Sequence, residues 1–175
     1  YPGAVSLFVY ETTKNSKYLS NIKVYGMTNH KITFPITYIN IQLEKNLLKS
    51  QTKSYVNKFI NLEKEKSSSI IEIHNRPIYI KFIVSKLPDR IISLYFHNDP
   101  LSMDGSKTIE NRKYLLNKCY KIIFNSHWSK KRFLEGLDSR FVNSNKLLVF
   151  YQSAAKGNLG LINNKEKWIT FVGKL

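Results

Sequence analysis

Three short apolar runs in the sequence each end in a cluster of polar side chains that could do chemistry. The clusters are His74-Asn75-Arg76 after Ile70–Ile73, His97-Asn98-Asp99 after Leu94–Phe96, and Asn125-Ser126-His127 after Ile122–Phe124. If these runs are neighbouring strands of a parallel sheet, their carboxyl ends meet at one edge, which is where such sheets bind ligands. The sequence therefore predicts a polar cleft with imidazole, amide, guanidinium and carboxylate groups.

The same side chains have structural interpretations that the sequence leaves open. His74 and His97 could form hydrogen bonds to loop backbone, and Asn75 and Asn98 could cap the turns that follow them. Asp99 could open a turn. Arg76 could form an ion pair with Glu72 or lie in solvent. Three further residues are expected to be structural: an exposed His127, a packed Trp128 and a buried, inert Cys119.

The residue spacing disfavours two kinds of catalytic site. His74, His97 and Asp99 are ligand types that zinc accepts, but the sequence has no His-x-x-x-His pair. It also has no Gly-x-Ser-x-Gly turn of the kind that exposes a nucleophilic serine. We therefore expect neither a metal site nor a serine triad.

Composition indicates a folded domain with a strongly basic surface. Of the 175 residues, 42% are hydrophobic and 13% aromatic, which excludes an intrinsically disordered chain. The single cysteine excludes an intramolecular disulfide, and no apolar run approaches the ~18 residues of a membrane span. A net charge of +16 attracts nucleic acid, anionic lipid or phosphorylated substrates, although a solvated lysine surface explains it equally well.

The apolar pattern alternates between short runs and amphipathic stretches, which is typical of a parallel α/β sheet. Helices are predicted at 3–19, 43–66, 77–87, 108–119 and 126–136. Strands are predicted at 22–26, 32–41, 70–74, 91–97, 121–125, 147–151 and 168–172. Pro35 makes the second of these an edge strand or an extended loop.

The end of the chain differs in composition from the rest. Residues 154–167 are rich in Gly, Asn and Lys and are expected to form a linker. We interpret 1–153 as one domain and 168–175 as the first strand of a second domain. The chain is accordingly expected to be a piece of a longer protein.

Six segments, in order along the chain, carry a resemblance to a known family. They are Pro2-Gly3-Ala4-Val5, His74-Asn75-Arg76-Pro77, Tyr95-Phe96-His97-Asn98-Asp99-Pro100, Lys121-Ile122-Ile123-Phe124-Asn125-Ser126, Leu148-Val149-Phe150-Tyr151-Gln152-Ser153 and Ile169-Thr170-Phe171-Val172-Gly173-Lys174-Leu175. Together they resemble the N-terminal half of GT-B glycosyltransferases in the family 4 group, which includes lipopolysaccharide-building enzymes. The chain departs from the family pattern at Ala4, usually a second glycine, at Gln152-Ser153, commonly Asn-Gly, and at Lys174, usually Arg.

The resemblance implies a Rossmann-like domain, with helices on both faces of a parallel sheet, in an enzyme that acts on nucleotide-sugars. That enzyme would be a retaining hexosyltransferase that moves a sugar to a hydroxyl of a glycan or lipid-linked acceptor. By matched position, His97 would be the catalytic histidine at the donor sugar. Gly3, Ala4, Gly173 and Lys174 would lie at the donor diphosphate, and His74, Asn75, Arg76, Asn98 and Asp99 would line the acceptor pocket. The resemblance implies no metal and no cofactor, because the nucleotide-sugar is a substrate.

The resemblance also has implications for the activity of the chain alone and for its location in the cell. The family's first strand and most of its donor-binding domain have no counterpart in the chain, so the chain alone is expected to be inactive. A cytoplasmic enzyme of cell-envelope polysaccharide synthesis is implied, and the basic charge suits peripheral contact with the anionic inner face of the plasma membrane. Two alternatives stay open: a non-enzymatic nucleic-acid-binding module, which fits the charge although no nucleic-acid motif is present, and a GT-B nucleotide-sugar epimerase.

Overall fold

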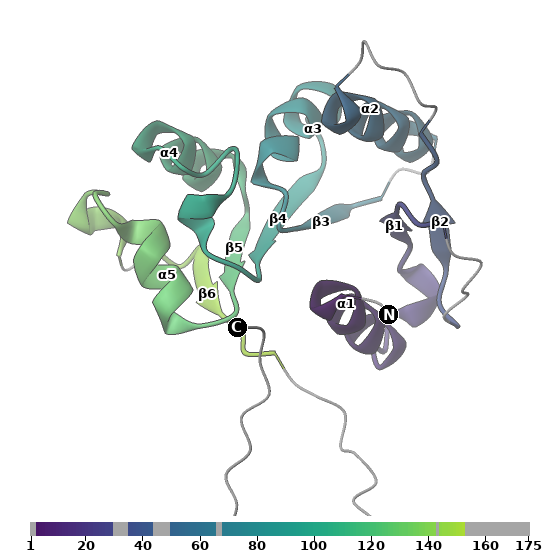
Figure 1. The fold of residues 1–175 in the computed structure, drawn as a ribbon, viewed down its shortest axis with the longest axis horizontal. Coiled ribbons are helices and arrows are strands. Elements are labelled where there is room, and N and C mark those ends of the chain that lie inside the picture. The colour runs from purple at the N-terminus through teal and green to yellow at the C-terminus, as the bar shows by residue number, and fades with distance from the viewer. Residues whose placement is uncertain (1–2, 30–34, 44–49, 66–67, 143, 153–175) are drawn as a thin grey trace, which may run out of the picture.

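The computed structural model describes residues 3–29, 35–43, 50–65, 68–142 and 144–152 (Figure 1). Its α-helices are α1 (Ala4–Lys14), α2 (Gln51–Lys64), α3 (Ile80–Lys86), α4 (Ile109–Lys118) and α5 (His127–Leu134). Its strands are β1 (Val24–Gly26), β2 (Tyr38–Asn40), β3 (Ile70–His74), β4 (Ile91–Phe96), β5 (Lys121–Phe124) and β6 (Leu147–Val149). Short 3₁₀ turns are η1 (Leu19–Asn21), η2 (Pro77–Tyr79), η3 (Pro100–Ser102) and η4 (Ser139–Phe141).

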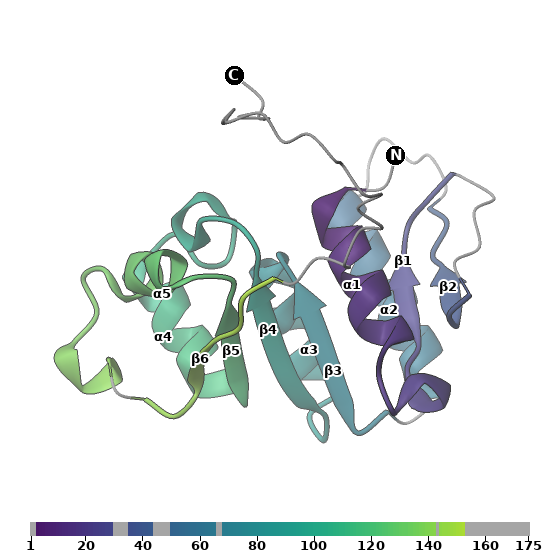
Figure 2. The ribbon, with the colours of Figure 1, turned by 90° about the horizontal axis from the view of Figure 1, so that it is seen from below.

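A parallel four-stranded sheet forms the centre of the fold. Its strand order is β3-β4-β5-β6, and each neighbouring pair runs parallel. Helices α3 and α4 lie along one face, with α2 beside α3, and α1 lies on the opposite face near β3 (Figure 1, Figure 2). Strands β1 and β2 form a separate parallel pair next to α1. The predicted class, α/β with a Rossmann-like parallel sheet, is confirmed.

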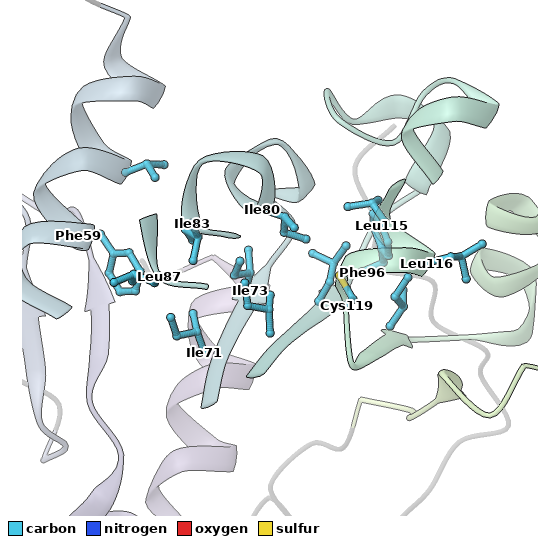
Figure 3. Packing of buried hydrophobic residues seen from close by; sticks show 14 of the residues in the cluster. Phe59, Ile71, Ile73, Ile80, Ile83, Leu87, Phe96, Leu115, Leu116 and Cys119 are labelled. Carbon is cyan, nitrogen blue, oxygen red and sulfur yellow. The ribbon is translucent and has the colours of Figure 1, made fainter. Parts of the chain in front are cut away.

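The two faces of the sheet differ in chemistry because alternate residues of a strand point to opposite faces. The face toward α3 and α4 carries the buried apolar side chains Ile71, Ile73, Ile92, Leu94, Phe96, Ile122 and Phe124. Figure 3 shows Ile80 and Ile83 of α3 and Leu115 of α4 packed over this face. Burying one such side chain contributes about 1.5–3 kcal/mol, so this layer holds the sheet in place. The opposite face carries Glu72, His74 and Tyr95.

Local sequence signals fix the connections that follow β4 and β5. The Ser126 hydroxyl accepts the backbone N–H three residues on and starts α5, and Thr108 starts α4 in the same way. Gly105, in the loop between β4 and α4, has a φ of 92°. A Cβ at that position would lie 2.5 Å from the backbone nitrogen of Ile78, so the loop requires glycine there.

The first helix is shorter than its apolar pattern predicts. It ends at Lys14 rather than near Leu19. The Ser16 hydroxyl accepts the Tyr18 N–H at 3.1 Å and holds a turn at that point. Side-chain hydrogen bonds of this kind compete with helix continuation, which explains the early end.

Other element bounds also differ from the prediction. The strand predicted at 32–41 covers Tyr38–Asn40 within the part that the structure describes. The helix predicted at 43–66 appears as α2, with 44–49 and 66–67 outside the described residues. Pro77 opens a 3₁₀ turn before α3 rather than the α-helix itself. The predicted linker and second-domain strand, 154–175, lie outside the described residues.

Candidate functional site

The three polar strand ends meet at one rim of the sheet, as their spacing predicts. β3, β4 and β5 are parallel neighbours, and His74 pairs in register with Tyr95, whose partner on β5 is Ile123. His74 at the end of β3 therefore lies beside His97, which follows β4, and His97 in turn lies beside Asn125, which follows β5. The predicted convergence is confirmed.

A continuous row of hydrogen-bonded side chains crosses this rim. Oε1 of Glu72 lies 2.9 Å from Nε2 of His74, and Nδ1 of His74 lies 2.8 Å from Nε2 of His97. Nδ1 of His97 lies 2.6 Å from the amide nitrogen of Gln152. We call these four residues the imidazole row. Every ring nitrogen in it has a partner, and the row joins β3, the end of β4 and the segment after β6.

Two asparagines hold the backbone of His97. Oδ1 of Asn75 accepts the His97 N–H at 2.7 Å, and Nδ2 of Asn125 donates to the His97 carbonyl oxygen at 2.7 Å. Asn75 has a φ of 52°, in the left-handed region that glycine adopts freely and asparagine adopts more often than most other residues. Backbone of this kind persists where surrounding contacts over-determine it, and it clusters at functional sites.

Aromatic side chains enclose His97. Tyr95 stacks on it with ring centres 4.3 Å apart, and Phe8 of α1 meets it edge-on at 4.9 Å. The Tyr95 hydroxyl donates to the carbonyl oxygen of Phe150, which ties the segment leading to Gln152 to β4. His97 is consequently 6% exposed.

Burial sets the charge state of His97. Burial, helped by His74, lowers the pKa of His97 from 6.5 to about 4, and Glu72 opposes this shift. The hydrogen bond with His74 is the main reason that the pKa of Glu72 lies below its ordinary value. Burial raises the pKa of Tyr95 to about 12. At neutral pH, His97 is therefore a neutral hydrogen-bonding group, and His74 separates it from the anionic Glu72.

Two of the residues predicted for the acceptor pocket are open to solvent. Arg76 is exposed and donates to the carbonyl oxygen of Asn75 at 3.2 Å. Glu72, the ion-pair partner considered for it, pairs with His74 instead. Asn98 is exposed as well. These side chains border the rim without joining the imidazole row.

Asp99 makes structural contacts. Its Oδ1 accepts the Leu101 N–H at 3.0 Å and opens the η3 turn. Its Oδ2 lies 3.1 Å from a guanidinium nitrogen of Arg132 on α5. This arrangement matches the turn-opening interpretation of Asp99 and links the loop after β4 to α5.

Of the four residues predicted to lie at the donor diphosphate, the structure describes Gly3 and Ala4. Gly3 precedes the first turn of α1 with a φ of −71°, and a Cβ there would meet nothing within 4 Å, so the position does not require glycine. Ala4 begins the helix, about one turn before Phe8, the residue that touches His97. Gly173 and Lys174 lie outside the described residues.

Three residues expected to be structural have mixed outcomes. His127 is exposed and Cys119 is a buried free thiol, as predicted. The prediction that Trp128 packs into the core is wrong, because its side chain is 58% exposed. Ser129 and Phe133, about one turn apart, take the inward positions of α5. Trp128 is rotated by about 100° from Ser129 and by about 140° from Phe133.

Sequence reasoning missed two members of the imidazole row. Glu72 shares a strand face with His74 because the two are separated by one residue, so the strand period was an available signal. Gln152 reaches His97 through the tie between Tyr95 and Phe150. That tie is a tertiary contact with no local signature.

The described residues also bear on metal binding and on membrane insertion. In the ranges that the structure describes, no group of three or more His, Cys, Asp and Glu side chains is placed to hold a metal ion. None of the helices in those ranges combines the length and the apolar character needed to cross a bilayer. Neither finding assigns a function.

Comparison with known proteins adds no family to these observations. No protein-family model matches the chain, and a search of curated proteins finds no match to its sequence. The functional interpretation therefore depends on the fold, on the rim of the sheet and on the order of the sequence segments.

Proposed function

We propose that the chain is the acceptor-side domain of a retaining GT-B glycosyltransferase of the family 4 group. The complete enzyme moves a sugar from a nucleotide-sugar to a glycan or lipid-linked acceptor in cell-envelope polysaccharide or lipopolysaccharide synthesis. The position of His97 carries the proposal: it directly follows β4, the second strand of the parallel sheet, and is buried between Tyr95 and Phe8. Open parallel sheets bind ligands at this edge, and the sequence resemblance assigns the donor sugar to the same histidine.

The charge state of His97 limits what it does in this reaction. A neutral imidazole suits a hydrogen bond to a sugar hydroxyl rather than neutralisation of a phosphate. Backbone N–H groups at the start of α1, at Gly3 and Ala4, would serve the diphosphate. The negative charge that develops on the leaving diphosphate needs cationic help, which we assign to Lys174 and to a donor-binding domain of the complete protein.

We further propose that the protein rests on an anionic membrane, the inner face of the plasma membrane, through α5. Trp128 is 58% exposed on this helix, and Lys131 is exposed beside it. Tryptophan favours the headgroup region of a bilayer, and lysine is attracted to anionic headgroups. Because α5 follows the same rim as His97, this contact would bring a lipid-linked acceptor close to the site.

The test uses the protein encoded by the complete reading frame. It is incubated with a panel of nucleotide-sugars and with glycan or lipid-linked acceptors, and the nucleotide released is compared with the mass gained by the acceptor. Equal amounts of free nucleotide and new glycan, with the anomeric configuration retained, are expected. An isomerised nucleotide-sugar without nucleotide release would replace the proposal with the epimerase. Salt-dependent oligonucleotide binding without turnover would replace it with a nucleic-acid-binding module.

A further inference from the structure

The donors and acceptors of the imidazole row determine where its protons lie. Gln152 presents its amide nitrogen, which can only donate, to Nδ1 of His97. Nδ1 is therefore an acceptor, and the neutral ring of His97 carries its proton on Nε2. That proton is donated to Nδ1 of His74, 2.8 Å away.

The same reasoning extends to Glu72. Because Nδ1 of His74 accepts, the His74 ring carries its proton on Nε2 and donates it to the Glu72 carboxylate, 2.9 Å away. An ionised carboxylate can only accept, so the row ends there with every hydrogen bond pointing in one direction. Reversing the row would need a second proton on His74, because both of its ring nitrogens would then donate.

We infer that Glu72 and His74 are positioning residues that hold His97 in the tautomer with its proton on Nε2. Nδ1 of His97 is then the acceptor for a hydroxyl of the donor sugar, and the Gln152 amide takes the place of that hydroxyl in this structure. The inference rests on the proposed function. It also moves His74 out of the acceptor pocket, since both of its ring nitrogens are already engaged.

The surroundings of the row agree with this direction. On the β3 side, Glu72 supplies the negative charge that His74 faces. On the β4 side, Tyr95 is a neutral phenol that donates its own proton to a backbone carbonyl oxygen and does not compete for the imidazoles. On the α1 side, Phe8 offers an apolar ring edge. The carboxylate is therefore the group that orients the row.

Nuclear magnetic resonance of the 175-residue chain, with ¹⁵N-labelled histidine, tests the tautomers without any substrate. We expect both His74 and His97 to show a protonated Nε2 and a bare Nδ1 at pH 7, with scalar coupling across the hydrogen bond between them. Glu72→Lys replaces an acceptor by a group that only donates, so both rings should shift to the Nδ1–H tautomer. The isosteric Glu72→Gln, which can donate or accept, should give a mixture. His127→Asn, a change in an exposed histidine, should leave the row unaltered.

Two spectral results would overturn the inference. One is a wild-type His97 with its proton on Nδ1. The other is a row whose tautomers stay the same in both Glu72 variants, which would mean that the carboxylate does not orient it. Unfolding curves of each variant show whether a changed spectrum reflects the tautomers or a loss of the fold.

Kinetics of the complete enzyme separate positioning from acceptor binding. Glu72→Gln should lower kcat, with the acceptor KM unchanged, in proportion to the fraction of His97 that the spectra show outside the Nε2–H tautomer. A raised acceptor KM with normal kcat would return His74 to the acceptor pocket and overturn the inference. A protein that keeps the tautomer pattern and transfers no sugar would instead overturn the proposed function and leave the tautomer assignment standing.

Discussion

Acid should destabilise this protein through His97, and the size of the effect follows from the structure. The pKa of His97 falls from 6.5 in an unfolded chain to about 4 in the folded one, because burial penalises its charged form. Between these two values the unfolded state holds a proton that the folded state lacks, so stability falls as the pH falls from 6.5 toward 4. At about 1.36 kcal/mol per pKa unit, the free energy of unfolding should drop by about 3 kcal/mol.

Urea unfolding of the wild type and of His97→Phe, followed by circular dichroism at pH 7 and pH 4, isolates this contribution. Phenylalanine keeps a ring between Tyr95 and Phe8 but cannot take up a proton. The loss of stability between the two pH values should therefore be about 3 kcal/mol smaller in the variant than in the wild type. Exposed His127 provides the control, because His127→Phe should keep the wild-type pH dependence. Equal losses in the wild type and in His97→Phe would refute the argument that His97 is buried as a neutral ring.

Three other predictions concern the loops and the surface. Gly105→Ala should lower the free energy of unfolding in urea by about 3 kcal/mol or more, since it adds a Cβ 2.5 Å from a backbone atom at a φ of 92°. At Gly136 the nearest atom to an added Cβ is a side-chain carbon at 3.1 Å. An equal loss of stability in Gly136→Ala would contradict this prediction. Asn75→Ala should lower the free energy of unfolding by about 2 kcal/mol, because alanine keeps the φ of 52° and loses a partly buried hydrogen bond to His97. The exposed Asn98→Ala should change it by less than about 0.5 kcal/mol. Trp128→Ala should weaken sedimentation with anionic vesicles while leaving stability within about 0.5 kcal/mol, and unchanged vesicle binding would exclude α5 as the contact.

The central sheet could be predicted because its signals are local. The strand at Ile70–His74 is bounded as predicted, since a short apolar run between polar clusters leaves little choice of register. Ser126 and Thr108 predict helix starts because the capping hydrogen bond involves a residue only three positions away. The convergence of the polar ends then follows from parallel neighbours alone.

The orientation of side chains on a helix is harder to predict, as Trp128 shows. Its size favours burial, but the small Ser129 and the ring of Phe133 fit the space between α5 and the sheet. Which face of a short basic helix turns inward depends on the shape of that space. The sequence around α5 does not encode this shape locally.

The imidazole row was predictable only in part, because some of its contacts depend on the folded structure rather than on local sequence. Strand ends place His74 and His97 near one another, and the strand period places Glu72 on their face. The direction of the hydrogen bonds depends on rotamers and on Gln152, which arrives from a segment 55 residues after His97. Contacts over such a sequence separation require the folded structure.

The most direct test of the account is the turnover of the complete enzyme with His97 replaced by alanine. Sugar transfer should fall about 100-fold relative to the wild type, in proportion to the loss of one well-placed hydrogen bond in the transition state. The matched variant His127→Ala, which removes an exposed imidazole near the same rim, should keep wild-type turnover. Equal rates of transfer by the two variants would contradict the placement of the active site at His97.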